Sequence, residues 1–166
     1  MAPEWDIAHW FNTPAPISLH GLRGRPVFAV AFQMLCPGCV SQGLPQAQRV
    51  ASMFADTDLA VIGLHTVFEH HEAQGSHAAL AAFLHEYRIK FPVGLDAPAE
   101  GGGPPRTMRL YGMRGTPTTL LFDRAGTLRL HQFGHLDDMR VGAAIATVLS
   151  SIDTNAGCEG DVCSLG

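Results

Sequence analysis

The sequence has 166 residues, 46% of them hydrophobic and 16% charged, and its formal net charge at pH 7 is -4. This length suits a single domain, the apolar fraction excludes a disordered chain, and the slight negative charge argues against a nucleic-acid partner. No apolar run approaches the roughly 20 residues of a membrane-spanning helix. Residues 1–6 lack the basic and apolar segments of a signal peptide, so we expect a cytoplasmic protein.

The first part of the chain contains one irregular segment and two apolar runs. Residues 10–25, rich in proline and glycine, are expected to form an irregular arm or a small hairpin. Residues 26–32 and 59–64 are continuous apolar runs of strand length. Such runs are typical of strands that are covered on both faces, as in a sheet flanked by helices.

Helical periodicity follows each of these two strands. A helix is predicted from Pro37 onward, with a kink after its first turn because Gly43 and Pro45 interrupt the pattern. After a polar, histidine-rich loop, a second helix is predicted over residues 76–87, with Ser76 as its candidate N-cap.

The last third of the chain predicts a hairpin and a closing helix. Residues 91–95 are expected to form a short edge strand because they contain a proline, and residues 107–111 a short helix. Residues 118–122 and 127–131 flank Asp-Arg-Ala-Gly, which is favourable hairpin chemistry. An apolar stripe predicts a helix over residues 137–149. This order of elements implies an α/β protein with a mixed sheet.

The four cysteines form two close pairs, Cys36/Cys39 and Cys158/Cys163. They are too few for a disulfide scaffold in so apolar a chain, so their spacing indicates redox or metal chemistry. Cys36 follows a predicted strand and begins a predicted helix, whose N-terminus stabilises a thiolate. Reduced Cys36 would attack a substrate disulfide, and Cys39, about one turn further on, would then attack Cys36 and release the reduced substrate.

A second feature, Gly115-Thr116-Pro117-Thr118, opens the predicted hairpin. A proline at the start of a strand is a position where a cis X-Pro bond can be used deliberately. Beside the cysteines, a cis Thr116–Pro117 bond would leave the Thr116 backbone free to pair with an extended substrate. It would also keep metal-ligating side chains away from the two cysteines.

A Cys-x-x-Cys motif after the first core strand, a later Thr-Pro before a hairpin and a closing helix together resemble the thioredoxin fold. The segment inserted between the second strand and Pro117 resembles TlpA-like thiol-disulfide oxidoreductases and the related AhpC/TSA redoxins. The resemblance covers about residues 10–150. It implies an α/β thioredoxin-like fold: a central mixed β-sheet flanked by helices, with an N-terminal extension and an αβ insertion before the cis-Pro strand.

The resemblance also implies roles for single residues. Cys36 would be the nucleophile, Cys39 the resolving cysteine and Pro117 the cis-proline, with Thr116 beside it binding substrate. No organic cofactor is implied, because the dithiol itself carries the electrons. The expected partners are a redox protein and a disulfide-bearing substrate.

Three positions depart from the family pattern. Leu35 stands where thioredoxins have a tryptophan, Val30 where they have a buried strand carboxylate, and Gln42 where TlpA-like proteins often have an acid. The usual proton acceptors for the Cys39 thiol are therefore missing. Glu69, just past the second strand, is a candidate substitute, and the alternative is that it is a solvated loop acid.

Two other functions are considered. A peroxiredoxin site resembles Pro-x-x-x-Thr/Ser-x-x-Cys with a distant arginine, but Ala29 and Gln33 occupy the proline and hydroxyl positions, although Arg114 could supply the cation. This mismatch disfavours a peroxidase.

A metal carrier is the other alternative. Copper would use Cys36 and Cys39 with a histidine such as His65, His70 or His135, since thiolates and imidazoles suit that metal. A zinc site would need both cysteine pairs, and the histidines are more simply explained as solvated loop residues. No metal is therefore expected.

The end of the chain is expected to differ from the rest. Residues 1–152 are predicted to form the thioredoxin-like domain and residues 153–166 a flexible tail. The tail pair, Cys158 and Cys163, is hypothesised to be a second dithiol that exchanges electrons with the first. The alternative is a pair of surface thiols without a role.

Overall fold

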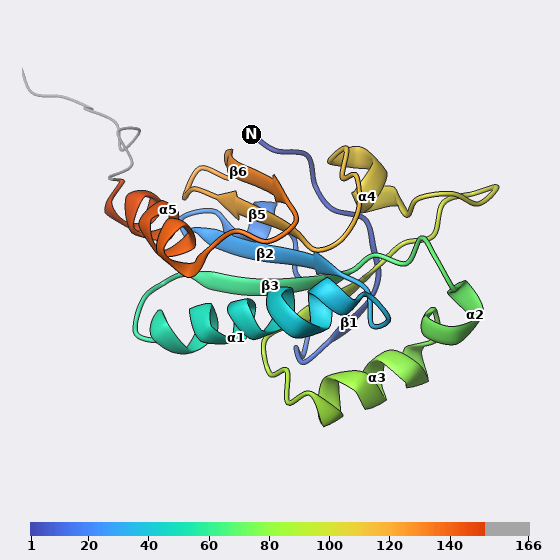
Figure 1. Cartoon of the computed structure of the whole chain (residues 1–166). Helices are drawn as coiled ribbons and strands as arrows, with labels where there is room; N and C mark the ends of the chain where they lie inside the picture. Colours follow the sequence, from blue (N-terminus) through green and yellow to red (C-terminus); the bar gives the residue numbers. More distant parts are fainter. Residues whose placement is uncertain (152–166) are drawn as a thin grey trace, which may run out of the picture.

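A mixed six-stranded sheet forms the centre of the computed structural model, which describes residues 1–151 (Figure 1). The strand order is β1-β4-β3-β2-β5-β6, in which β2, β3 and β4 are parallel and the pairs β1–β4, β2–β5 and β5–β6 are antiparallel. The strands are β1 (Ile7–Phe11), β2 (Val27–Phe32), β3 (Ala60–His65), β4 (Val93–Asp96), β5 (Thr118–Phe122) and β6 (Leu128–Phe133). This architecture confirms the predicted α/β fold with a mixed sheet.

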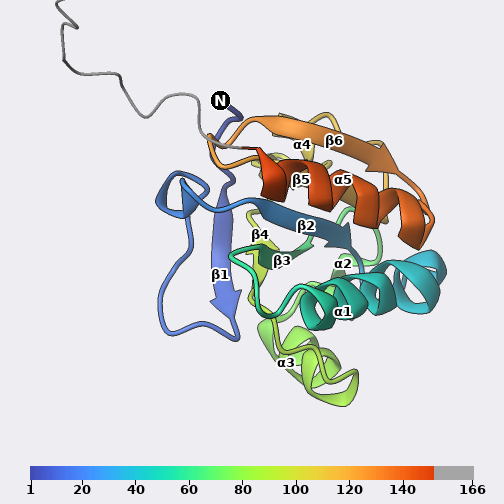
Figure 2. The same ribbon diagram turned by 90° about the vertical axis from the view of Figure 1, so that its left-hand side faces the viewer.

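Helices cover one face of the sheet more fully than the other. The helical elements are η1 (His20–Leu22), η2 (Cys39–Gly43), α1 (Leu44–Met53), α2 (His71–Gln74), α3 (His77–Glu86), α4 (Arg106–Leu110) and α5 (Asp138–Ser150). Apolar residues of α1, α3 and α5 pack on one face, and Figure 2 shows α1 and α5 on the same side of the sheet. None of the helices within residues 1–151 has the length and apolar character needed to cross a bilayer.

The strand β2 shows why the sequence predicted burial on both faces. Its alternate residues Phe28, Val30 and Phe32 pack toward α1, α3 and α5. Val27, Ala29 and Ala31 pack toward α4 and toward the N-terminal arm (residues 1–26) on the opposite face. Because side chains alternate along a strand, only a continuous apolar run fills both layers.

The N-terminal segment corrects two expectations. The strand β1, which was not predicted, overlaps the start of the segment expected to be irregular (residues 10–25) and pairs antiparallel with β4 from Phe11↔Val93 to Ile7↔Asp96. As a result β4 is an inner strand rather than the predicted edge strand, and Pro92 precedes it without removing a ladder donor. The pairing joins segments that are far apart in the chain, so no local sequence pattern predicts it.

Local signals predicted the other elements well. Ser76 caps α3 by accepting a hydrogen bond from the Ala79 N–H at 3.1 Å. In the hairpin between β5 and β6, the Asp123 carboxylate accepts hydrogen bonds from the backbone N–H groups of Ala125 and Thr127. The histidine-rich loop contains the short helix α2, which was not predicted. Cys158, Cys163 and the predicted boundary at residue 152 lie outside the described residues.

Candidate active site

Three loops meet at one edge of the sheet. The strands β2 and β3 run parallel, so both end at this edge, and β5 runs antiparallel to β2, so it begins there. The loops after β2 and β3 and the loop before β5 line a groove of about 290 Å³. Residues that line it include Gln33, Leu35, Cys36, Glu69, Thr116 and Phe133. The fold therefore brings Cys36 beside Thr116, as the sequence predicted.

The two cysteines differ in exposure and in chemistry. Cys36 is partly exposed, whereas Cys39 is completely buried, and both are free thiols. The Cys39 backbone N–H donates a hydrogen bond to the Cys36 sulfur at 3.2 Å, which places a helix-terminal donor on that sulfur. Burial, together with the neighbouring Cys36 sulfur, raises the pKa of the Cys39 thiol to about 12. Cys36 is thus the accessible sulfur, and Cys39 stays protonated at neutral pH.

Thr116 and Pro117 form the opposite wall of the site. The peptide bond between them is cis, as expected. The Thr116 carbonyl oxygen lies 3.5 Å from the Cys36 sulfur and accepts its S–H. The Pro117 carbonyl accepts a hydrogen bond from the Gly134 N–H at 2.8 Å, which ties this wall to the end of β6.

The helix that carries the cysteines begins with an unusual turn. Residues Cys39–Gly43 form the π-helix η2, and the Leu44 N–H donates to the Cys39 carbonyl. A Cβ atom on Gly43 would lie only 2.9 Å from the Cβ of Pro117. The sequence predicted an interruption after the first turn of the helix, and the structure has a π-helical turn there, whose glycine lets Pro117 approach the helix. Turns of this kind are frequent at functional sites.

Two buried glutamines hold the loops in place. The Gln33 side-chain oxygen accepts hydrogen bonds from the backbone N–H groups of Phe68 and Glu69 and from the Gln74 amide, at 3.0–3.2 Å. Gln74 in turn accepts a hydrogen bond from the Leu35 N–H at 3.1 Å. This network links the β3 loop to the residue before Cys36. The sequence analysis missed it, because Gln33 and Gln74 are 41 positions apart and no local pattern pairs them.

The two positions considered for proton transfer lie in different surroundings. Glu69 is exposed and lines the groove, but within residues 1–151 its carboxylate makes no hydrogen bond to either cysteine. Val30, which stands at the position of the thioredoxin carboxylate, is buried beside Gly43. Burial is the main cause of the raised pKa of the Cys39 thiol.

The candidate metal ligands do not come together. His65 is buried at the end of β3, and desolvation lowers its pKa to about 4. His70 and His135 are both exposed. Among residues 1–151, no three His, Cys, Asp or Glu side chains are arranged to hold a metal ion. The described residues therefore do not fit the copper site considered from the sequence.

The arginine considered for peroxide chemistry has another contact. The Arg114 guanidinium lies over the Phe133 ring, 5.4 Å from its centroid. Gln33, at the position of the peroxidase hydroxyl, already accepts three hydrogen bonds. Neither residue is arranged as the peroxidase alternative requires.

Comparisons with known proteins agree with this geometry. The family model described as AhpC/TSA family matches residues 1–131. A crystal structure of a thioredoxin-like superfamily protein is 55% identical, with a TM-score of 0.88, 91% coverage of this chain and 97% of that one. A thiol-disulfide isomerase from Corynebacterium glutamicum is 44% identical, with a TM-score of 0.86 and coverage of 92% and 97%. StoA from Bacillus subtilis shares the fold at 19% identity, with a TM-score of 0.61 and coverage of 78% and 87%. None of the curated proteins matches the sequence.

Proposed function

Because the chain belongs to the AhpC/TSA family of thioredoxin-like proteins, we propose that it is a thiol-disulfide oxidoreductase that works through Cys36 and Cys39. One observation carries the proposal. An accessible thiol lies against the Thr116 carbonyl of a cis-proline segment, while a second, buried thiol follows one turn later. This arrangement suits a nucleophile and a resolving group that act in sequence.

The cycle begins with the Cys36 thiolate. It attacks one sulfur of a substrate disulfide, so that a Cys36–substrate bond forms, the substrate S–S bond breaks and the first substrate thiol leaves with a proton. Cys39 then gives up its proton and attacks the Cys36 sulfur, which releases the second substrate thiol. The substrate gains two electrons and two protons, and the enzyme holds a Cys36–Cys39 disulfide that a redox partner protein must reduce. The same steps in reverse oxidise a dithiol.

The resolving step is the demanding one in this chain. The Cys39 thiol is buried and has a pKa of about 12, so it loses its proton reluctantly. We propose Glu69 as the acceptor, reached through the groove that it shares with Cys36. A slow resolving step prolongs the mixed disulfide and gives a second substrate thiol time to attack it. This supports isomerisation as well as reduction, in keeping with the name of the 44% identical neighbour.

Two parallel assays test the proposed function. The full chain should catalyse the reduction of insulin disulfides by dithiothreitol, and Cys36→Ser should abolish that activity. A peroxide-consumption assay on the same preparation should show slow turnover, because the described site lacks the peroxidase hydroxyl. Rapid peroxide turnover without disulfide reduction would overturn the proposal in favour of a peroxidase.

A further inference from the structure

The groove around Cys36 has chemically different sides. In the sheet order, β2 lies between β3 and β5, so Cys36 lies between the loop after β3 and the loop before β5. The β3 side carries the exposed carboxylate of Glu69. The β5 side carries Gly115 and Thr116, and beyond them the Phe133 ring at the end of β6.

Arg114 adds a cation to the β5 side. Its guanidinium lies over the Phe133 ring, which is 40% exposed and lines the groove. Within residues 1–151 it makes no ion pair or hydrogen bond, so its donors are free to bind a ligand. The aromatic ring restrains the position of the cation without neutralising it.

The chain direction brings Arg114 within reach of a bound substrate. Arg114 precedes Thr116 by two residues, in the bend-containing stretch just before β5, so an extended substrate segment that paired with the Thr116 backbone would pass close to Arg114. Side chains two residues apart on paired strands are diagonal neighbours, and long side chains reach across that distance. A substrate residue near the reactive cysteine can therefore meet the Arg114 guanidinium.

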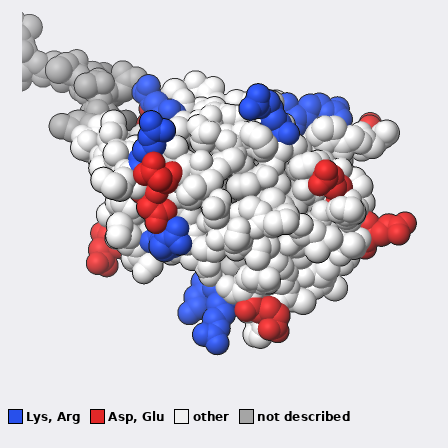
Figure 3. All heavy atoms as spheres, in the orientation of Figure 1, with Lys and Arg blue, Asp and Glu red and all other residues white. Residues whose placement is uncertain are grey.

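The rest of this surface has few competing charges. Figure 3 shows that Lys, Arg, Asp and Glu lie toward the margins of the face drawn and leave the region over η2 and the start of α1 uncharged. Leu35, 56% exposed, adds apolar surface at the same groove.

We propose that Arg114 selects polypeptide disulfides with a carboxylate side chain close to the reactive cysteine. The proposal rests on the proposed function and names its substrate class. Phe133 positions the guanidinium, Thr116 aligns the peptide, and Glu69 disfavours an acidic residue on the other side of Cys36.

The test uses three peptide disulfides that differ only in the residue two positions from the cysteine: Asp, Asn or Lys. The full chain should reduce the Asp peptide with a kcat/KM about two- to five-fold above that of the Asn peptide, as expected for one exposed ion pair. The Lys peptide should be the poorest substrate. Added salt should bring the three values together, because it screens exposed charges.

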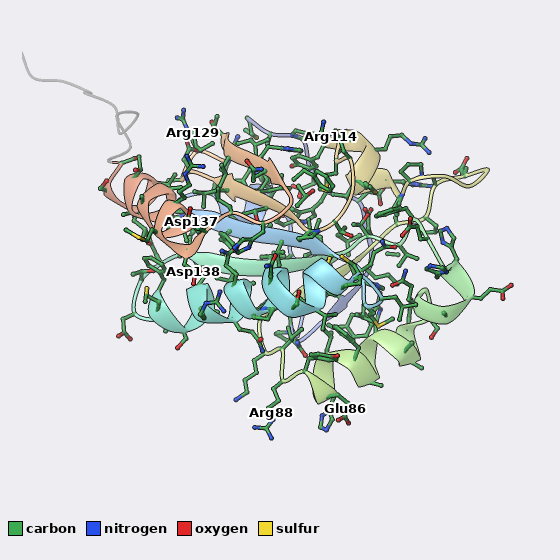
Figure 4. All side chains as sticks on the ribbon, in the orientation of Figure 1. Glu86, Arg88, Arg114, Arg129, Asp137 and Asp138 are labelled. Atoms are coloured by element: carbon green, nitrogen blue, oxygen red, sulfur yellow. The ribbon has the colours of Figure 1, made fainter. Side chains whose placement is uncertain are left out.

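Arg114→Gln and Arg88→Gln have equal net charge and form a matched pair, and Arg114→Glu reverses the charge at the site. Arg114→Gln should reduce the Asp/Asn ratio to one, and Arg114→Glu should favour the Lys peptide. Arg88→Gln removes a cation from the opposite end of the molecule (Figure 4) and should keep the wild-type ratio. Equal rates for all three peptides in the wild-type protein would overturn the proposal and leave the oxidoreductase function intact. If no peptide were reduced, the oxidoreductase function itself would fail.

Discussion

At the scale of single residues, the site depends on the unequal burial of two thiols. Cys36 is reached from the groove and receives the Cys39 backbone N–H, whereas the Cys39 thiol is buried and has a raised pKa. The first sulfur can therefore react with an external disulfide, while the second can react only with the first. In the proposed cycle, this asymmetry sets the order of the two exchange steps.

His65 is a second buried group whose titration has a measurable consequence. Its Nε2 accepts a hydrogen bond from the Met34 N–H at 3.4 Å, and its Nδ1 has no partner among the described residues. Burial lowers its pKa from 6.5 to about 4. The neutral ring therefore stabilises the loop that leads to Cys36, and protonation opposes folding.

We expect the free energy of unfolding to fall as the pH falls through this range. The unfolded chain binds a proton at His65 below pH 6.5 and the folded chain only near pH 4. The contribution of neutral His65 to the free energy of unfolding is fully present above pH 6.5, and roughly 3 kcal/mol of it is lost by about pH 4. Urea unfolding across this range should show a steeper decline for the wild type than for His65→Gln. Equal slopes in the two proteins would contradict this assignment.

At the scale of elements, the π-helix η2 sets the distance between the cysteines and the cis-proline segment. Gly43 lies in this turn, where a side chain would meet Pro117 at 2.9 Å and approach Val30 at 3.8 Å. Since Thr116 precedes Pro117, any displacement of the proline also moves the carbonyl that contacts Cys36.

Gly43→Ala should therefore slow the reaction of Cys36 with a peptide disulfide. A displacement of about 1 Å can cost roughly 10²-fold in rate, and we expect a loss of at least about ten-fold. The rate of mixed-disulfide formation, measured over a range of pH, would detect this loss. A displaced Thr116 carbonyl should also change the shape of the pH profile, whereas a purely structural defect would leave that shape unchanged.

Gly142→Ala is the matched control for that prediction. Gly142 lies in α5 with nothing within 4 Å of an added Cβ. Alanine is favoured over glycine in helices by about 1 kcal/mol, so this variant should be slightly more stable and equally active. An unchanged rate in Gly43→Ala would show that Pro117 does not depend on this turn.

Elements with local signals were predictable, and those with distant partners were not. The strand at 26–32, the helix capped by Ser76 and the hairpin followed from periodicity and turn chemistry. The strand β1 was missed because its half-exposed residues alternate weakly and its partner, β4, lies far along the chain. The part of the fold that the sequence did not predict is thus the pairing of strands that are distant in the chain.

The site was predictable to a similar extent. The sequence indicated Cys36, Cys39 and the cis bond before Pro117, because the Cys-x-x-Cys and Gly-Thr-Pro-Thr motifs lie next to predicted strands. It did not indicate the Gln33–Gln74 network, whose two amides meet at 3.0 Å across 41 positions of the chain. Side chains that support a loop from a distance have no local signature.

At the scale of the whole molecule, the N-terminal arm is part of the folded domain. Trp5 is only 6% exposed and packs edge-on against Phe122 of β5, with ring centroids 6.4 Å apart. Its indole N–H donates to the Ile17 carbonyl at 2.8 Å, which holds the arm together. The arm covers the face of the sheet that α1, α3 and α5 leave open.

Trp5→Ala should lower the free energy of unfolding by about 3–5 kcal/mol, because it opens a cavity in this second layer. Urea unfolding followed by circular dichroism would measure the loss. Met139→Ala, at a side chain that is 86% exposed, should change stability by less than about 0.5 kcal/mol. If the two variants were equally stable, the arm would contribute little to the fold.

The central claim is that Cys36 alone bonds to the substrate and that Cys39 releases it. The most direct measurement is mass spectrometry of the Cys39→Ser variant after incubation with a peptide disulfide, followed by digestion to locate the adduct. We predict one peptide attached through Cys36, stable until a thiol is added, and none at this motif in Cys36→Ser. A Cys39→Ser variant that carries no adduct at Cys36 would contradict the account.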